Sequence, residues 1–495
     1  MKNKKIIAGL SALLMLIPTI TINQTANAKE VKSPSITQSV KGDVNGDSSF
    51  NLSDMVMFRR WLQGKASLAN NITGDVNGDE KLDIFDYIAM RKMLINCIQS
   101  EENSLSKGTV NLCQGINESN IAETSLDDDY ILGQTKLTLE LMKNEVKANQ
   151  NTLISPSSII QALAMCANGA DGQTKAEMEN VLGGMDIDEL NKCLYTQWYS
   201  NNDEENEKCK VTTANSIWMK NGRIQASPEF VQKNIDYYKS EIFTSPFDTT
   251  TVDDINNWVN EKTNKMIPSV ISEISRDMVM FLINAVSFDA KWVEPFSEYQ
   301  VKEGKFTASD GTVQTVDMMS NEENIYIKDD YATGFIKYYS GYKYAFAALL
   351  PEEGMTIEDY IDTLTPESFN KMLANCTDTT VDIQMPKFTT SYSTELKNSL
   401  SEIGMPTAFS KNADFSKMTE NLMPLQIDDI IHKARIEVSE DGTKAAAVTV
   451  IKVVETCVKS DRKSVTLDRP FVYCIVDTET LLPLFIGTLN KIEQE

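Results

Sequence analysis

The chain has 495 residues, of which 41% are hydrophobic and 24% charged, and this composition of a folded globular protein excludes disorder throughout. The formal net charge of −24 excludes the basic surface that nucleic-acid binding requires, and an anionic membrane would repel the chain. His432 is the single histidine, which excludes metal sites and catalytic mechanisms that need two or more histidines.

The N-terminus has the pattern of a secretory signal peptide. Three lysines precede an apolar stretch at 6–20, and the small residues Ala26 and Ala28 mark a cleavage site. We therefore expect a signal peptide at 1–28 and a secreted, extracellular protein. An uncleaved membrane anchor is the alternative, but the apolar stretch is short for a span.

A connecting segment at 29–40 precedes two copies of one pattern, residues 42–64 and residues 74–96. Each copy is an acidic GDVNGD loop followed by an amphipathic helix. Oxygen-bearing side chains recur at alternate loop positions, as a hard cation such as Ca²⁺ requires, and two copies in register make a solvated turn a poor explanation. We therefore expect two Ca²⁺ ions. The residues at the ligand positions, with Lys81 contributing its backbone carbonyl, are Asp43, Asn45, Asp47, Ser49, Asn51, Asp54, Asp75, Asn77, Asp79, Lys81, Asp83 and Asp86.

The paired loops, with helices that contain FRRWL and MRKML, resemble a dockerin module, and Asp54 and Asp86 close the loops as Asp does in dockerins. The resemblance implies a small all-α calcium-binding domain at 41–97 that binds a cohesin domain of a scaffold protein, as in cellulosomes. The two halves differ at the family's recognition positions, so the cohesin type and the equivalence of the halves stay open. The expected cohesin-binding residues are Leu52, Ser53, Arg59, Arg60, Ile84, Phe85, Arg91 and Lys92.

Residues 98–126 are rich in Ser, Asn, Glu and Gln and are expected to form a linker with some local order. From 127 to 495 the chain alternates helical patterns such as 158–168 with strand-like runs such as 344–350, and no internal linker divides it. This pattern predicts one large mixed α/β domain. None of the eight cysteines forms a CxxC pair, so we expect mostly buried free thiols.

The large region resembles a serpin, a serine protease inhibitor, over nearly its whole length. Several segments follow one another in serpin order and spacing: NTLISPSSII, INNWVNEKTNKMI, NAVSFDAKWVEPF, LLPEEG, MPKFTTSYSTELKNSLSEIG and PLFIG. The resemblance implies an α+β serpin fold at 127–495 with three β-sheets, about nine helices and an exposed reactive loop. It also implies a monomeric inhibitor rather than an enzyme.

Small residues fill the base of the expected reactive loop, which reads EDGTKAAAVTV from Glu440. Small side chains can enter a packed sheet without a clash, and alternate residues of an entering strand face the core. The chain also has no proline from Ser439 to Lys459. We therefore interpret the loop base as a mobile hinge, which is typical of inhibitory serpins. The hinge residues are Glu440, Gly442, Thr443, Ala445, Ala446 and Ala447.

The resemblance also implies which bond a target protease cuts. In inhibitory serpins the cut bond follows the seventeenth residue of a count that begins at the glutamate before the hinge. Here that glutamate is Glu440 and the count ends at Thr456, so Thr456–Cys457 is the expected reactive bond. A small polar residue before the bond favours a subtilisin-like or elastase-like serine protease. The loop is a few residues longer than in a typical serpin. If the extra residues precede the bond, the cut moves toward Lys459–Ser460 and a trypsin-like target.

The resemblance to serpins implies a polar cluster beneath the point where the main sheet opens. It also implies that Trp292 lies at the top of that sheet. His432 stands in IIHKARIEV, without an acidic neighbour at a triad-like position, so we interpret it as structural. The cluster consists of Ser155, Ser158, Asn284 and His432.

Two other functions compete with inhibition. A non-inhibitory serpin would be a structural or binding component of the scaffold complex and would lack a functional hinge. A glycosidase would need two facing carboxylates on a catalytic fold, and no motif singles out such a pair. The sequence thus predicts a secreted suicide inhibitor that protects a cellulosome-type complex from proteolysis.

Overall fold

The chain forms two compact units, Met1–Ser104 and Leu105–Glu495. No described helix combines the length and apolar character that a membrane span requires. The expected signal peptide lies outside the described residues. The computed structural model describes residues 40–46, 50, 52–69, 72–79, 81–102, 105–106, 108–201, 208–263, 265, 267–275, 278–375, 377–421, 424–428, 430–443 and 462–493.

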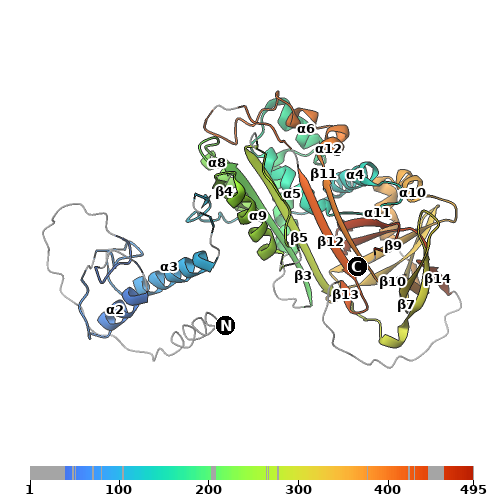
Figure 1. The fold of residues 1–495 in the computed structure, drawn as a ribbon, viewed down its shortest axis with the longest axis horizontal. Coiled ribbons are helices and arrows are strands. Elements are labelled where there is room, and N and C mark those ends of the chain that lie inside the picture. Colours follow the sequence, from blue (N-terminus) through green and yellow to red (C-terminus); the bar gives the residue numbers. More distant parts are fainter. Residues whose placement is uncertain are drawn as a thin grey trace. The chain divides into compact units, whose positions relative to one another are not determined.

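The described part of the N-terminal unit contains two helices, α2 (Leu52–Leu62) and α3 (Ile84–Glu102), and each follows one of the acidic loops (Figure 1). The duplication in the sequence is also a duplication in the packing. That the whole module is α-helical stays a prediction, because parts of both loops lie outside the described residues. The buried core consists of Met55 and of two pairs of equivalent residues from the repeats, Val44 with Val76 and Phe58 with Met90.

Seven strands form the main sheet of the large unit, in the spatial order β1-β4-β3-β5-β13-β12-β11 (Figure 1). β3 and β5 have 12 residues each and pair antiparallel along nearly their whole length, whereas β13 has only 2 residues. The main sheet is therefore continuous on one side of β5 and interrupted on the other. The strand bounds are β1 Val110–Asn111, β4 Glu241–Ser245, β3 Cys209–Lys220, β5 Met280–Lys291, β13 Gly442–Thr443, β12 Ile431–Val438 and β11 Phe388–Glu395.

The other strands form one hydrogen-bonded path in the order β14-β10-β7-β8-β9-β15-β16-β2, with β6 paired to β7. β7 has 16 residues, and its first part pairs with β6 while its last part pairs with β8. The three sheets expected of a serpin fold are present in this form, with β7 joining the two smaller ones. The bounds are β14 Lys463–Thr466, β10 Thr377–Pro386, β7 Val313–Lys328, β6 Val301–Thr307, β8 Ala332–Tyr338, β9 Tyr344–Pro351, β15 Phe471–Asp477, β16 Pro483–Leu489 and β2 Thr152–Ile154.

Helices cover both faces of the main sheet. α5 contacts β5 and β16 and therefore lies between the two sheet systems, and all of its residues are buried. α9 packs on the opposite face, where its Trp258 joins Trp218 of β3 and Phe281 of β5 in one buried cluster. The α-helices in the described part of the large unit are α4 Asp128–Glu145, α5 Pro156–Ala167, α6 Gly172–Val181, α7 Ile187–Asn201, α8 Pro228–Tyr238, α9 Thr249–Lys262, α10 Ile357–Thr363, α11 Pro366–Ala374 and α12 Lys397–Ile403.

The described residues of 105–126, expected as part of a linker, fold against the large unit instead. β1 pairs with β4 at the edge of the main sheet. Asp254 of α9 accepts hydrogen bonds from Ser106 N at 2.9 Å and from Thr109 Oγ1 at 2.8 Å. This part of the expected linker is therefore ordered. Leu112, Cys113 and Leu126 also pack against the core, but they are too widely spaced to form a hydrophobic period in the sequence.

Five of the eight cysteines have side chains that the structure describes, and all five are free thiols. Burial raises the pKa of each above its ordinary value, so these thiols are protonated and inert near neutral pH. These five cysteines agree with the expectation of mostly buried free thiols. The five are Cys113, Cys166, Cys193, Cys209 and Cys474.

Candidate functional site

The main sheet has an opening between β5 and β12. The short strand β13 lies between them, where Thr443 pairs with Val438 of β12 and with Ala290 of β5. Beyond β13, no ladder joins β5 to β12 among the described residues. β5 and β12 lie close to each other along this line without pairing, so a longer strand could enter between them once they separate, and this line between the strands is called the slot.

Side chains from both flanking strands line this slot. Each strand runs antiparallel to β13, so the two are parallel to each other, and Val438 lies level with Ala290 across Thr443. The same count backward along each strand brings His432 level with Asn284. The slot thus begins apolar and ends at a polar pair. The buried residues between its two ends are Phe288 and Val286 of β5 and Ile436 and Ala434 of β12.

A tight turn connects β12 to β13. Ser439 N donates a hydrogen bond to Gly442 O at 2.9 Å, and Ser439 Oγ donates to the same oxygen at 3.1 Å. Gly442 has a φ of +153°, and a Cβ atom there would lie 2.1 Å from Ala290 O. Only glycine tolerates this close approach, so Gly442 allows Thr443 to enter the sheet.

Trp292 and Tyr339 form a stacked pair at this end of the slot, with ring centroids 4.4 Å apart and an angle of 14° between the planes. Tyr339 Oη and Thr443 Oγ1 share a hydrogen bond of 2.7 Å, and Trp292 Nε1 donates to Ser439 O at 2.9 Å. Burial raises the pKa of Tyr339 well above its ordinary value, so the phenol keeps its proton. The two rings therefore hold both ends of the turn.

Backbone and charged contacts fix the middle of the turn. Trp292 N donates to Asp441 O at 3.0 Å, and Phe296 N donates to Glu440 O at 2.8 Å. Glu440 also forms an ion pair with Lys387 at 2.9 Å. Partial burial raises the pKa of Glu440. The hydrogen bond and the charge of Lys387 lower it by a larger amount, so the pKa lies below its ordinary value. Glu440 is therefore ionised at neutral pH.

The predicted hinge is only partly described. Glu440, Gly442 and Thr443 form the turn and β13, whereas Ala445, Ala446, Ala447 and the expected reactive bond Thr456–Cys457 lie outside the described residues. The chain resumes at Arg462, which donates to Asp382 at 2.5 Å and to Glu322 at 2.8 Å before β14 pairs with β10. Both ends of the expected loop are therefore anchored to sheets.

His432 lies at the polar end of the slot and is 4% exposed. Its Nε2 accepts a hydrogen bond from Ser155 N at 3.2 Å, and Ser155 Oγ donates to Leu484 O at 2.8 Å. Burial lowers the pKa of His432 to about 4, and the nearby Glu145 carboxylate opposes this shift only in part. A neutral imidazole whose Nε2 is already an acceptor cannot take a proton from a serine hydroxyl, so the contacts of His432 are structural.

Asn284 lies opposite His432 in the slot. It connects to the middle of α5, whereas His432 contacts Ser155 just before that helix. Its amide donates to Asn215 Oδ1, and Asn215 donates to Gln161 Oε1 of α5 at 2.9 Å. Ser158 is buried on the same helix. The structure thus brings Ser155 and His432 into direct contact and ties Asn284 to α5 through Asn215, a connection that sequence reasoning missed.

Sequence reasoning also missed Glu145, at the end of α4. This carboxylate is 3% exposed and accepts hydrogen bonds from Ser399 Oγ at 2.5 Å, Thr394 Oγ1 at 2.7 Å and Tyr392 Oη at 2.8 Å. Thr394 pairs with His432 across β11 and β12, so Glu145 belongs to the same buried polar network. A single Glu at the end of a helix usually faces solvent, so its sequence gives no signal of this role.

The two acidic loops of the N-terminal unit have equivalent internal hydrogen bonds. Asp54 Oδ1 accepts from Val44 N at 2.9 Å, and Asp86 Oδ1 accepts from Val76 N at 2.9 Å. Both carboxylates are fully buried, and the side chains around them offer the oxygen donors that Ca²⁺ prefers. Within the described ranges no three Asp, Glu, His or Cys side chains gather at one point. The predicted ligands Asp47, Ser49 and Asn51 lie outside those ranges.

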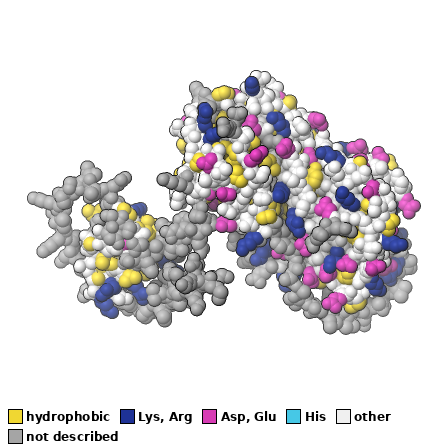
Figure 2. Space-filling model, viewed as in Figure 1, with side chains coloured by type: hydrophobic (Ala, Val, Ile, Leu, Met, Phe, Trp, Pro, Cys, Tyr) yellow, Lys and Arg dark blue, Asp and Glu magenta, His cyan; other side chains and the backbone are white. Residues whose placement is uncertain are grey.

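Several hydrophobic side chains of the N-terminal unit face solvent, and Figure 2 shows hydrophobic side chains on its described surface. They include two of the predicted cohesin-binding residues, Ile84 at 41% and Phe85 at 62% exposure. Of the remaining predicted positions, Arg60 and Lys92 are exposed, and Arg59 and Arg91 are half-buried. The side chains of Leu52 and Ser53 lie outside the described residues.

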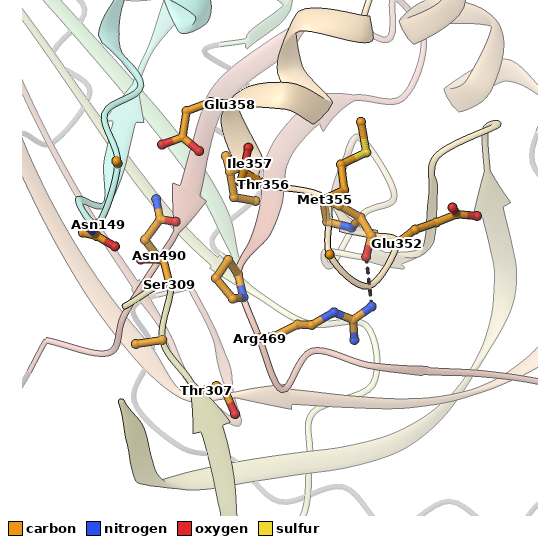
Figure 3. Close-up of a pocket in the computed structure, with 15 residues that line it drawn as sticks. Asn149, Thr307, Ser309, Glu352, Met355, Thr356, Ile357, Glu358, Arg469 and Asn490 are labelled. Atoms are coloured by element: carbon orange, nitrogen blue, oxygen red, sulfur yellow. Dashed lines mark hydrogen bonds between the residues drawn. The ribbon is translucent and has the colours of Figure 1, made fainter. Parts of the chain in front are cut away.

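A separate cavity of about 430 Å³ lies at the ends of β6, β9 and β16, beside α10 (Figure 3). Its lining includes Glu358, Asn490 and Arg469, and Arg469 donates to Pro351 O at 2.9 Å. None of its lining residues belongs to β5, β12 or β13. The cavity is therefore not part of the slot.

The comparisons with known proteins agree with both units. Residues 132–492 match the family model described as serpin (serine protease inhibitor), and residues 41–106 match the dockerin type I domain. An uncharacterized serpin-like protein of Methanosarcina acetivorans is 30% identical over 413 residues, which cover 81% of this chain and 95% of the relative. Human glia-derived nexin is 31% identical over 367 residues, which cover 70% and 88% of the two chains. The crystal structure of the thermophilic serpin tengpin in the native state is 41% identical, with a TM-score of 0.75, and covers 78% of this chain and 100% of tengpin.

Proposed function

The chain belongs to the serpin family and carries an N-terminal dockerin type I domain, and on this basis we propose that it is a secreted suicide inhibitor of serine proteases. Cleavage of the loop between Thr443 and Arg462 would be followed by insertion of its N-terminal part into the slot between β5 and β12. The dockerin would attach the inhibitor to a cohesin of a cellulosome-type scaffold, where it protects the complex from proteolysis.

The position of β13 is the observation that carries this proposal. Thr443 already pairs with both flanking strands, and the slot continues past it. Extension of β13 in the same register would place Ala445 and Ala447 against the apolar part of the slot. Thr449 would then come level with Asn284 and His432. The polar and apolar residues of the loop therefore match those of the slot.

The chemical step belongs to the target protease. Its serine Oγ would attack the carbonyl carbon of Thr456, forming an ester, while the Thr456–Cys457 peptide bond breaks and the new amine of Cys457 takes a proton from the protease histidine. Insertion of the cut loop as a new strand would then displace the protease before water hydrolyses the ester. One inhibitor molecule would be consumed for each protease, so the protein is no enzyme. The expected target is a subtilisin-like or elastase-like protease.

We further propose that the two acidic loops bind two Ca²⁺ ions. Bound Ca²⁺ would neutralise the carboxylates at the ligand positions of each loop, Asp54 and Asp86 among them. The loops would then hold α2 and α3 in the orientation that exposes the cohesin-binding residues. The exposed pair Ile84 and Phe85 offers an apolar surface for that contact.

A denaturing gel tests the proposed function. Incubation with a subtilisin-like protease should give a covalent complex that survives denaturation. Cleavage of the loop without such a complex would favour the second candidate, a non-inhibitory serpin that is a structural or binding component of the scaffold. The family membership keeps that alternative open, but the glycine turn and the seated Thr443 favour inhibition.

A further inference from the structure

Lys337 of β8 is a buried lysine in an otherwise apolar part of the sheet. Its side chain is 1% exposed, and its Nζ lies 2.5 Å from Glu323 Oε1 of β7, which is itself 14% exposed. Nζ also donates to the backbone oxygen of Glu294 at 2.9 Å. A buried charge is costly unless it is paired and hydrogen-bonded, and here both conditions are met.

The same ammonium group contacts the aromatic residues that hold the hinge. Lys337 Nζ lies 5.5 Å from the ring centroid of Trp292 and 4.6 Å from that of Phe296, within the range of cation–π attraction. Trp292 N and Phe296 N are the donors that bind the turn at Asp441 and Glu440. One lysine therefore contacts two rings and one carbonyl of the segment 292–296.

Among the described residues, segment 292–296 pairs with β8 and the residue after it only at its start, where Val293 N donates to Tyr338 O at 3.0 Å. Trp292 makes one isolated bridge, to Tyr339, and the chain then leaves β5 toward β6. Lys337 and Glu323 attach the rest of the segment to β8 and β7, which belong to the second sheet system. An ion pair outside the main sheet thus contributes to the position of the turn.

We infer that Lys337 and Glu323 are positioning residues that hold segment 292–296 in place and thereby keep Thr443 seated between β5 and β12. The inference rests on the proposed function. With Thr443 seated, insertion of the cut loop only has to extend an existing strand. Without the ion pair, the backbone N–H donors of Trp292 and Phe296 would no longer be held in place beneath the turn. Each insertion would then first have to pair Thr443 with β5 and β12.

The direction of the effect separates this role from a purely structural one. A mutation that only destabilises the uninserted fold raises its free energy toward that of the transition state for insertion. Such a mutation therefore accelerates insertion. Loss of the positioning pair should instead slow insertion, by about tenfold, which corresponds to ~1.4 kcal/mol in the barrier. The acyl-enzyme then has more time to hydrolyse, and more inhibitor is used for each protease blocked.

The test compares the full-length protein with three variants, Lys337→Met, Glu323→Gln and the double variant. Lys337→Met keeps the length of the side chain over the two rings and removes the charge. Lys328→Met, at an exposed position of β7, is the matched control. The first measurement is the stoichiometry of inhibition against subtilisin. The second is the rate at which the protein gains heat stability after thermolysin cuts the loop, since thermolysin forms no acyl-enzyme.

We expect a higher stoichiometry and slower insertion in both single variants, no further loss in the double variant, and no change in Lys328→Met. Unchanged or faster insertion in Lys337→Met and Glu323→Gln would overturn the inference. If the unmodified protein inserts its loop after thermolysin cleavage but forms no complex with subtilisin, the proposed inhibition fails. The insertion rates of the variants still decide the role of Lys337 in that case.

Discussion

The hydroxyl oxygens of Tyr339 and Thr443 lie 2.7 Å apart in the buried interior of the large unit. Thr443 is the first residue after the glycine turn, and it is 1% exposed. The loop therefore begins inside the main sheet, with its first inward side chain already hydrogen-bonded. Insertion of the remainder continues a strand that exists before any protease arrives.

Replacement of Thr443 by Arg should convert the inhibitor into a substrate. The guanidinium would have to be buried beside Tyr339 without a counter-charge, at a cost of several kcal/mol, so insertion would be slow and the acyl-enzyme would hydrolyse. The stoichiometry of inhibition measures this change. Glu437→Arg, at an exposed position of neighbouring β12, is the control and should remain an inhibitor. Equal stoichiometry for Thr443→Arg and the unmodified protein would show that insertion does not require a small buried side chain at position 443.

Gly442→Ala should destabilise the protein more than the loss of glycine's backbone freedom alone would, because the new methyl group would clash with the neighbouring strand. A Cβ at Gly442 would lie 2.1 Å from Ala290 O, whereas a Cβ at Gly311, which also has positive φ, meets no atom within 4 Å. Gly311→Ala thus reports the conformational cost alone, about 1–2 kcal/mol. The melting temperature of Gly442→Ala should fall below that of Gly311→Ala. A smaller loss in Gly442→Ala would contradict the seated position of β13.

The stability of the uninserted protein should decrease below pH 6.5, partly through His432. Its pKa is lowered from 6.5 to about 4 in the folded state, so the unfolded chain binds more protons between these values. The associated stability is present above pH 6.5 and is lost as the pH falls through about 4, with an upper limit of about 3 kcal/mol. Urea unfolding at pH 7 and pH 4.5 measures it. His432→Gln should show a smaller difference between the two pH values, and an equal difference would assign the acid sensitivity to carboxylates alone.

Removal of Ca²⁺ should abolish cohesin binding. Without the ion, the carboxylates at the ligand positions of each loop would stay uncompensated when the loop closes, so the loops before α2 and α3 should open. Calorimetric titration of the metal-free protein should find two sites, and Asp86→Ala should remove one of them. Protease inhibition by the large unit should persist in chelator, which serves as the internal control. Cohesin binding that is unchanged in excess chelator would contradict the calcium assignment.

The sequence predicted the parts of the fold that are carried by contiguous motifs. The duplicated loops and the glycine turn at Gly442 follow from runs of neighbouring residues, whereas the region of the main sheet opening was expected only from the resemblance to serpins. The roles of Tyr339 and Lys337 could not be predicted, because they depend on which strands lie side by side. Lys337 stands alone within the apolar run of β8, and that isolated charge is the one signal the sequence offered. Some local order was expected within 98–126, but its attachment to the large unit could not be predicted, since isolated polar and apolar contacts leave no periodic pattern.

The intact mass of the reaction products under denaturing conditions tests the central claim most directly. After reaction with a subtilisin-like protease, we predict one covalent species that contains the protease and the chain through Thr456, together with a released fragment that begins at Cys457. A released fragment that begins at Ser460 would move the reactive bond. Free protease with two separate fragments of the chain, and no covalent species, would contradict the account of this protein as a protease trap.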